Sequence, residues 1–167
     1  MATYNPYGQQ SMGDCKWPEL YEKWCLGNTD AAAVMGRFAR LSQLADDFVD
    51  EEVKGDRSKS MVDLLHIALV ELPINPFYRR FQTTYGSVII QVLLMYHASN
   101  EWYDEDKRDV QMFSFVWREA TELLINHTAY LVGGLEHAQQ VVSELREHWK
   151  ENDPDKLLQW SKERGGR

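Results

Sequence analysis

The fold is decided by the stretch Val88-Ile89-Ile90-Gln91-Val92-Leu93-Leu94-Met95-Tyr96, in which every residue except Gln91 is apolar or aromatic. The run is too short to cross a bilayer, which takes roughly 20 apolar residues. A helix that is apolar on all sides is typical of the centre of a folded domain. We therefore expect residues 77–102 to form a helix that is buried in the core, and we expect no membrane span.

The segments on both sides of this stretch have the periodicity of amphipathic helices. Their apolar residues recur every three or four positions, which predicts helices with one packed face. After an N-cap at Thr29, the face of residues 29–53 carries Val34, Phe38, Leu41, Ala45 and Phe48. The face of residues 58–72 carries Met61, Leu64, Leu65, Ala68 and Leu72. Further along, Gly133-Gly134 predicts a left-handed C-cap between two helices.

These elements predict one helical domain. In order, the predicted helices cover residues 17–27, 29–53, 58–72, 77–102, 106–132, 136–151 and 154–160. No stretch alternates with the period of a strand, so we expect no sheet. The predicted fold class is all-α, a single-domain bundle of about five to seven helices joined by short loops. Residues 1–14 are expected to form a polar N-terminal arm, residues 15–162 the bundle and residues 163–167 a loose tail.

The charge and the cysteine content narrow the possible functions. The chain has 26 Asp and Glu against 18 Lys and Arg, a formal net charge of −8. Such a surface repels a phosphate backbone, which argues against nucleic acid as the main partner. Cys15 and Cys25 are too few for a disulfide framework, and no signal-like segment begins the chain. We therefore expect a cytoplasmic protein in a reducing compartment.

The run Ala45-Asp46-Asp47-Phe48-Val49-Asp50-Glu51-Glu52 resembles the first aspartate-rich motif of the squalene and phytoene synthase family. The resemblance implies carboxylates that hold Mg²⁺ ions, which in turn bind the diphosphate of a prenyl substrate. At about 100° per residue, however, Asp46 and Asp50 point nearly opposite the apolar face of their helix. We therefore expect a solvated acidic surface, with a magnesium site of Asp46, Asp47, Asp50 and Glu51 as the alternative.

The position of this acidic run on its helix also requires an explanation. Five carboxylates lie near the predicted C-terminus of a helix, where the helix dipole disfavours negative charge. The arrangement predicts a compensating cation. Lys54, Arg57 or Lys59 could supply it, and a metal ion or a basic partner surface would serve equally.

A second acidic group closes the central helix. His97, Glu101 and Asp104 are spaced by four and three residues, so they share one side of a helix. Three such ligands are enough for a catalytic metal, and a two-metal site would follow if this group met the acidic run. The spacing is also common by chance, and we expect His97 to end an ordinary core helix.

The segment Phe77-Tyr78-Arg79-Arg80 interleaves aromatic and basic side chains. This composition is typical of surfaces that contact an acidic or planar partner. The segment therefore predicts a partner-binding site. In the other interpretation it is an ordinary helix start, and its arginines pair with nearby carboxylates.

No sequence signature of a known catalytic mechanism is present, such as a Walker loop, a nucleophile elbow or a His-Glu-x-x-His helix. We therefore expect a non-enzymatic helical protein, without a cofactor, that contacts other proteins or itself as a subunit of a larger assembly. Small ring or connector subunits of viral particles are an analogy at the level of the fold, and they would place the chain in a virion. The alternatives are a Mg²⁺-dependent enzyme acting on a phosphate or diphosphate ester, and an acidic inhibitor of a basic site.

Overall fold

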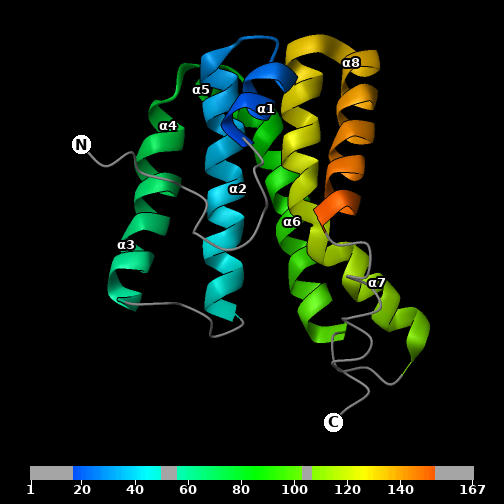
Figure 1. Cartoon of the computed structure of the whole chain (residues 1–167). Coiled ribbons are helices and arrows are strands. Elements are labelled where there is room, and N and C mark those ends of the chain that lie inside the picture. Colours follow the sequence, from blue (N-terminus) through cyan, green and yellow to red (C-terminus); the bar gives the residue numbers. More distant parts are fainter. Residues whose placement is uncertain (1–16, 50–55, 103–106, 153–167) are drawn as a thin grey trace.

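The computed structural model describes residues 17–49, 56–102 and 107–152 (Figure 1). All regular structure in these ranges is helical, and none of it is strand. Six helices in these ranges have eight residues or more. The all-α, single-domain prediction is therefore confirmed. The predicted N-terminal arm, the helix 154–160 and the C-terminal tail lie outside the described residues.

The helices lie side by side along most of the molecule. The long ones are α1 (Trp17–Trp24), α2 (Thr29–Val49), α3 (Arg57–His66), α6 (Gln82–Trp102), α7 (Arg108–Arg118) and α8 (Glu122–Asn152). The short α4 (Leu72–Ile74) and α5 (Pro76–Arg80) connect α3 to α6. In Figure 1, α2, α6 and both halves of α8 have nearly parallel axes, and α3 lies on the side of α2 away from α6. The helix α7 crosses the lower end of the bundle.

A tight turn joins α1 to α2. Leu26 and Gly27 have positive φ angles of 50° and 78° there. The side-chain oxygen of Asn28 accepts a hydrogen bond from the Ala31 backbone N–H at 3.0 Å. Asn28 is therefore the N-cap, one residue before the predicted Thr29, because an N-cap side chain bonds to the amide two or three residues further on.

Two of the predicted helices are interrupted. After α3, the chain continues as a π-helical segment, Ile67–Glu71, and ends its helical course at Ile74. Asn75 then caps α5 by accepting from the Tyr78 backbone N–H at 3.0 Å. The helix predicted for residues 77–102 breaks at Phe81, whose φ and ψ are −114° and 18°.

The last part of the bundle is a helical hairpin. The helix predicted for residues 106–132 divides at the 3-10 segment Glu119–Thr121, which separates α7 from α8. Within α8 the chain reverses at Gly134, whose φ is 77° and ψ is −170°. The predicted turn at Gly133-Gly134 is confirmed, because a positive φ is accessible to glycine at little cost. Figure 1 shows the two halves of α8 beside one another.

The core lies where α1, α2, α6 and α8 converge. Its largest fully buried side chains include Trp24, Tyr85, Met35 and Leu145. The Tyr85 hydroxyl and Thr128 Oγ1 are 2.7 Å apart in a buried hydrogen bond between α6 and α8. Thr128 also donates to the Leu124 carbonyl at 2.7 Å, so the polar atoms of this contact are satisfied.

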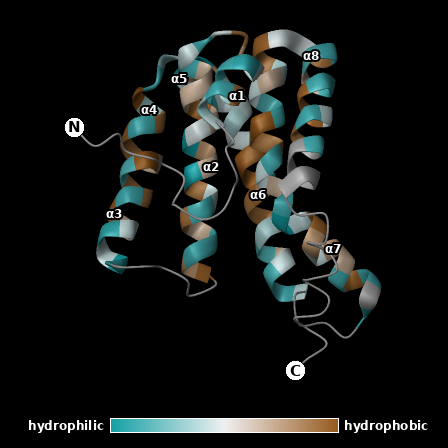
Figure 2. Cartoon of the chain, viewed as in Figure 1, coloured by the Kyte–Doolittle hydropathy of each residue, from teal (hydrophilic) through white to brown (hydrophobic). Residues whose placement is uncertain are grey.

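Two predictions of burial are wrong. Val92 of the apolar run is 5% exposed, but Ile90, Leu93 and Leu94 are 58%, 61% and 57% exposed. Figure 2 shows hydrophobic colour along the middle of α6. The helix α3, which is described throughout, buries none of its residues, and its Met61 and Leu65 are exposed. Periodicity placed these apolar faces correctly, but the chain covers them only in part.

Candidate functional site

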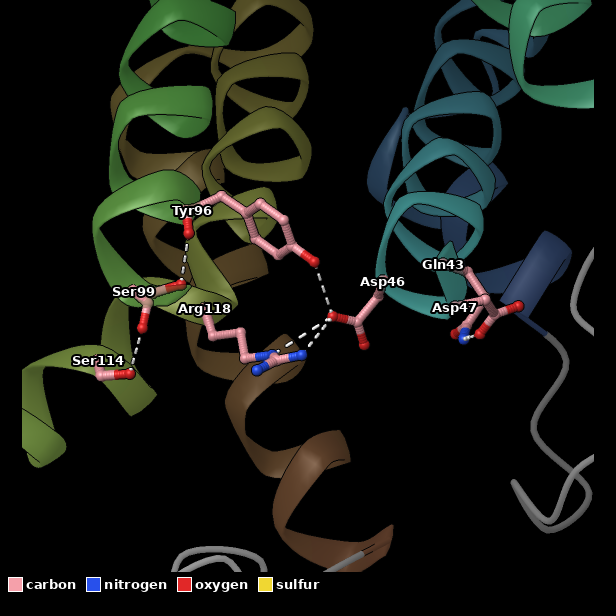
Figure 3. A network of polar contacts seen from close by, with 7 residues as sticks. All are labelled: Gln43, Asp46, Asp47, Tyr96, Ser99, Ser114 and Arg118. Atoms are coloured by element: carbon pink, nitrogen blue, oxygen red, sulfur yellow. Dashed lines mark hydrogen bonds and ion pairs between the residues drawn. The ribbon is translucent and has the colours of Figure 1, made fainter. Parts of the chain in front are cut away.

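Asp46 lies in a polar network between α2, α6 and α7 (Figure 3). Its Oδ1 accepts hydrogen bonds from the Tyr96 hydroxyl at 3.0 Å and from Arg118 Nη2 at 3.1 Å. The sequence places Asp46 opposite the apolar stripe of α2, on a solvated surface. Its side chain is 40% exposed, but it also contacts α6 and α7. The helix α2 has neighbours on more than one side, so its contact surface is wider than its apolar stripe.

The compensating cation for Asp46 is Arg118, which is 72 residues away in the chain. The nearby Arg57 instead lies over the Phe48 ring, 6.0 Å from its centroid. Burial, reinforced by the charge of Asp46, raises the pKa of Tyr96 above its ordinary value. The ion pair joins helices that the sequence pattern alone could not place together.

Two buried serines continue the network from α6 to α7. Ser99 Oγ donates to the Tyr96 carbonyl at 2.7 Å, and Ser114 Oγ donates to the Ser99 carbonyl at 2.7 Å. Ser99 and Ser114 are 1% and 0% exposed. Because buried hydroxyl groups need partners, these bonds fix how α7 packs on α6.

Asp47, His97 and Glu101, the other predicted metal ligands within the described ranges, do not gather around Asp46. Asp47 accepts from Gln43 Nε2 at 2.7 Å, on the other side of α2 in Figure 3. His97 Nε2 lies 3.5 Å from Glu101 Oε1, and their side chains are 73% and 63% exposed.

In the described ranges, no group of three or more His, Cys, Asp or Glu side chains could hold a metal ion. Asp50, Glu51 and Asp104 lie outside the described residues. The magnesium hypothesis stays a prediction.

The predicted partner-binding segment divides into a core part and a surface part. Phe77 is buried against Phe81, with ring centroids 4.9 Å apart. Tyr78 stacks on Tyr85 at 5.3 Å. Arg79 and Arg80 remain exposed. Phe77 therefore belongs to the core and the half-buried Tyr78 packs against it, whereas Arg79 and Arg80 are open to solvent.

The outer face of α6 is one of the exposed apolar surfaces of the described residues, beside those of α3 and α7. We define this outer face by Gly86, Ile90, Leu93, Leu94 and His97. The segment from Gln82 to Asn100 contains no Asp, Glu, Lys or Arg. Ordinary helices carry charged or polar residues on their exposed side.

The opposite side of α6 is packed against α7 and α8, where Tyr85, Val92 and Ser99 are 0%, 5% and 1% exposed. From Gln82 to Asn100 the helix is therefore uncharged around its circumference, but this chain covers it on one side only. The apolar run Val88–Tyr96 of this helix was visible in the sequence, where it predicted burial within the same chain.

Gly86 adds an independent observation on the outer face. Among the described residues, no atom lies within 4 Å of the position that a Cβ on Gly86 would occupy. A glycine in a helix interior destabilises it by roughly 0.5–1 kcal/mol relative to alanine. Packing within the described chain gives no reason for this glycine.

No model of a protein family, no curated protein and no solved structure matches this chain. The described residues also include no helix long and apolar enough to cross a membrane. The interpretation of the α6 outer face therefore rests on its own chemistry.

Proposed function

We propose that this chain is a non-enzymatic helical subunit of a larger assembly and that it works through protein–protein contacts. The observation that carries the proposal is the α6 outer face, an uncharged helical surface whose Ile90, Leu93 and Leu94 are more than half exposed. Contiguous apolar patches on otherwise polar surfaces mark interaction sites.

The apolar side chains of this face supply the driving force for association. Full burial of a leucine or isoleucine side chain stabilises by about 1.5–3 kcal/mol. Since Ile90, Leu93 and Leu94 are 57–61% exposed, a partner gains roughly half of that from each. The absence of charge between Gln82 and Asn100 means that no ionic group loses its hydration when the face is covered.

The compartment we propose is reducing, as in the cytoplasm or inside a virion. Cys25 supports this proposal, because it is a free, buried thiol. Burial raises the pKa of Cys25 to about 12, so the thiol stays protonated and unreactive. Small helical subunits of viral particles are the analogy at the level of the fold.

The mass of the native protein tests the proposal. By light scattering, we expect a species heavier than the 19.5 kDa chain, either a self-assembly or a complex with a co-purified protein. Leu93→Glu should dissociate that species into single chains, because it places a charge in the centre of the contact. A single 19.5 kDa species over a wide concentration range, without a co-purified protein, would contradict the proposal.

Leu135→Glu is the matched control. Leu135 is 65% exposed on α8, close to the 61% of Leu93, and the exposed polar residues Glu136 and Gln139 lie near it in the chain. The two variants add the same charge to a similarly exposed apolar position. An equal effect of both would show that added charge, and not the α6 outer face, changes the mass.

A further inference from the structure

We infer that the partner of the α6 outer face is a second copy of this chain, bound antiparallel about a two-fold axis between Ile90 and Leu93. The inference rests on the proposed function and specifies its partner. It follows from the register of α6, from the sizes of the facing residues and from the charges at the two ends of the helix.

The register of the face is that of paired helices. Gly86, Ile90, Leu93 and His97 follow one another at intervals of four, three and four residues. Residues at this spacing lie on one side of a helix, in the positions that form the contact line between paired helices, and the two central ones, Ile90 and Leu93, are apolar. The intervals read the same in both directions, so the face is symmetric about its midpoint. An antiparallel pair then places Ile90 against the partner's Leu93 twice, once on each side of the axis.

The sizes of the end residues are complementary in the same register. Gly86 and His97 are equally distant from the midpoint, so Gly86 of one copy lies opposite the partner's His97. The smallest residue of the face therefore meets a bulky imidazole, whose side chain is 73% exposed in the single chain. The open space beside Gly86 accommodates this ring, which explains a glycine that packing within the chain does not explain.

The charges favour the antiparallel over the parallel arrangement. Arg79 and Arg80 are exposed directly before the start of α6, and Glu101 is exposed in its last turn. Antiparallel pairing brings the basic end of one helix to the acidic end of the other. Parallel pairing would place arginine beside arginine and Glu101 beside the partner's Glu101.

The length of the helix sets the expected affinity. A helix of 21 residues is about 31 Å long at 1.5 Å per residue. One strip of this length presents less than the about 800 Å² per partner of a standard interface. We therefore expect a dissociation constant in the micromolar range.

Sedimentation equilibrium from micromolar to millimolar concentration tests the self-association. We expect a monomer–dimer equilibrium whose dissociation constant rises about a hundredfold or more with Leu93→Glu. Leu135→Glu should leave it unchanged. Circular dichroism shows whether each variant keeps its helices.

Cysteine cross-linking tests the orientation in the full chain. The variants are made in a Cys15→Ser background. The remaining native thiol, Cys25, is 0% exposed and does not compete for disulfide formation. In the antiparallel dimer, position 93 lies near the two-fold axis, close to position 93 of the second chain. The Leu93→Cys variant should therefore form an intermolecular disulfide. The two positions 101 of the dimer lie about 28 Å apart along the helix axis, so the Glu101→Cys variant should form no disulfide with itself. A mixture of Gln82→Cys and Glu101→Cys chains should cross-link.

Each outcome decides the inference. Self-cross-linking of Glu101→Cys would show parallel pairing and overturn the antiparallel axis. A wild-type monomer that still binds another protein through α6 would overturn the self-association but leave the proposed function intact. A monomer that binds no protein would overturn both.

Discussion

Two apolar surfaces of this molecule differ in what covers them. The side chains of Trp24, Val34 and Met35 are 1%, 0% and 0% exposed, because α1, α2 and α8 close over them. On the outer face of α6, Ile90 and Leu93 are 58% and 61% exposed. Both surfaces have the spacing of a packed helix face in the sequence. The comparison teaches that periodicity identifies an apolar face but does not identify which chain covers it.

Polar contacts reinforce the closed surface. Glu144 accepts hydrogen bonds from Lys23 Nζ and from Trp24 Nε1, each at 2.8 Å. His137 Nε2 lies 2.7 Å from the Trp24 carbonyl oxygen. These contacts tie α1 to the second half of α8. The outer face of α6 is uncharged from Gln82 to Asn100, so ionic contacts like these can lie only at its ends.

The largest effect should separate the two surfaces directly. Trp24→Ala should lower the free energy of unfolding by about 3–5 kcal/mol, because it leaves a large cavity in a closed core. Leu93→Ala should change the same quantity by less than about 0.5 kcal/mol, as exposed positions do. Urea unfolding measures both changes in the isolated chain, free of any stabilisation by association. Trp24→Ala is compared in a Leu93→Glu background, and Leu93→Ala is measured at low protein concentration. Equal losses would mean that α6 is already covered by its own chain.

A smaller effect is expected where α2 meets α6 and α7. Asp46→Asn should lower the free energy of unfolding by about 1 kcal/mol or less, because the Asp46 side chain is 40% exposed and water screens its pair with Arg118. Asp47→Asn on the neighbouring position is the control and should have no more effect than loss of its bond to Gln43. A stability gain in Asp46→Asn would show that repulsion within the acidic run outweighs the ion pair.

Glycine substitutions should have opposite signs at two positions. Gly86→Ala should raise the stability of the isolated chain by about 0.5–1 kcal/mol, because its new methyl group meets open space. The same methyl group should weaken dimerisation about tenfold, by crowding the partner's His97.

Gly133→Ala is the counterpart in the closed region. Its Cβ would lie 2.5 Å from Cδ2 of His137, so thermal unfolding should occur at a lower temperature than in the wild type.

Stronger dimerisation of Gly86→Ala would argue against the antiparallel register.

The smallest effect concerns acid. Hydrogen bonds from Lys23 and Trp24 lower the pKa of Glu144 below its ordinary 4.5. Because the folded-state pKa is lowered, its contribution to stability is complete above about pH 4.5 and disappears as the pH falls through the lowered value.

Glu144→Gln should therefore lose less stability than the wild type between pH 5 and pH 3, by a few tenths of a kcal/mol, as suits a partly exposed pair. Unfolding curves at both pH values measure this difference, with Glu147→Gln on the same helix as the control. An identical pH dependence in wild type and Glu144→Gln would show that the α1–α8 contact is not stabilising.

Much of the fold could be predicted from local signals. The helical class, the turn at Gly134 and the single domain follow from spacing and from glycine and proline positions. The predicted N-cap was Thr29 and the observed one is Asn28. Both residue types can cap a helix, and only the backbone geometry selects one of them. The break at Phe81 could not be predicted, because the residues around it favour a continuous helix.

The candidate site was only half visible in the sequence. The apolar run Val88–Tyr96 was evident, but its partial exposure was not, since it depends on where α3 and α7 pack. The pairing of Asp46 with Arg118 was invisible for the same reason. An acidic run predicts a cation, but many cations in the chain could fill that role.

By itself, the sequence determined that this protein is a helical bundle, because helix formation and helix ends depend on residues within a few positions of one another. Only the tertiary structure decided that α6 is covered on one side and open on the other. That outcome depends on contacts between residues far apart in the chain, such as Tyr85 with Thr128 and Asp46 with Arg118. Local periodicity carries no information about such distant contacts.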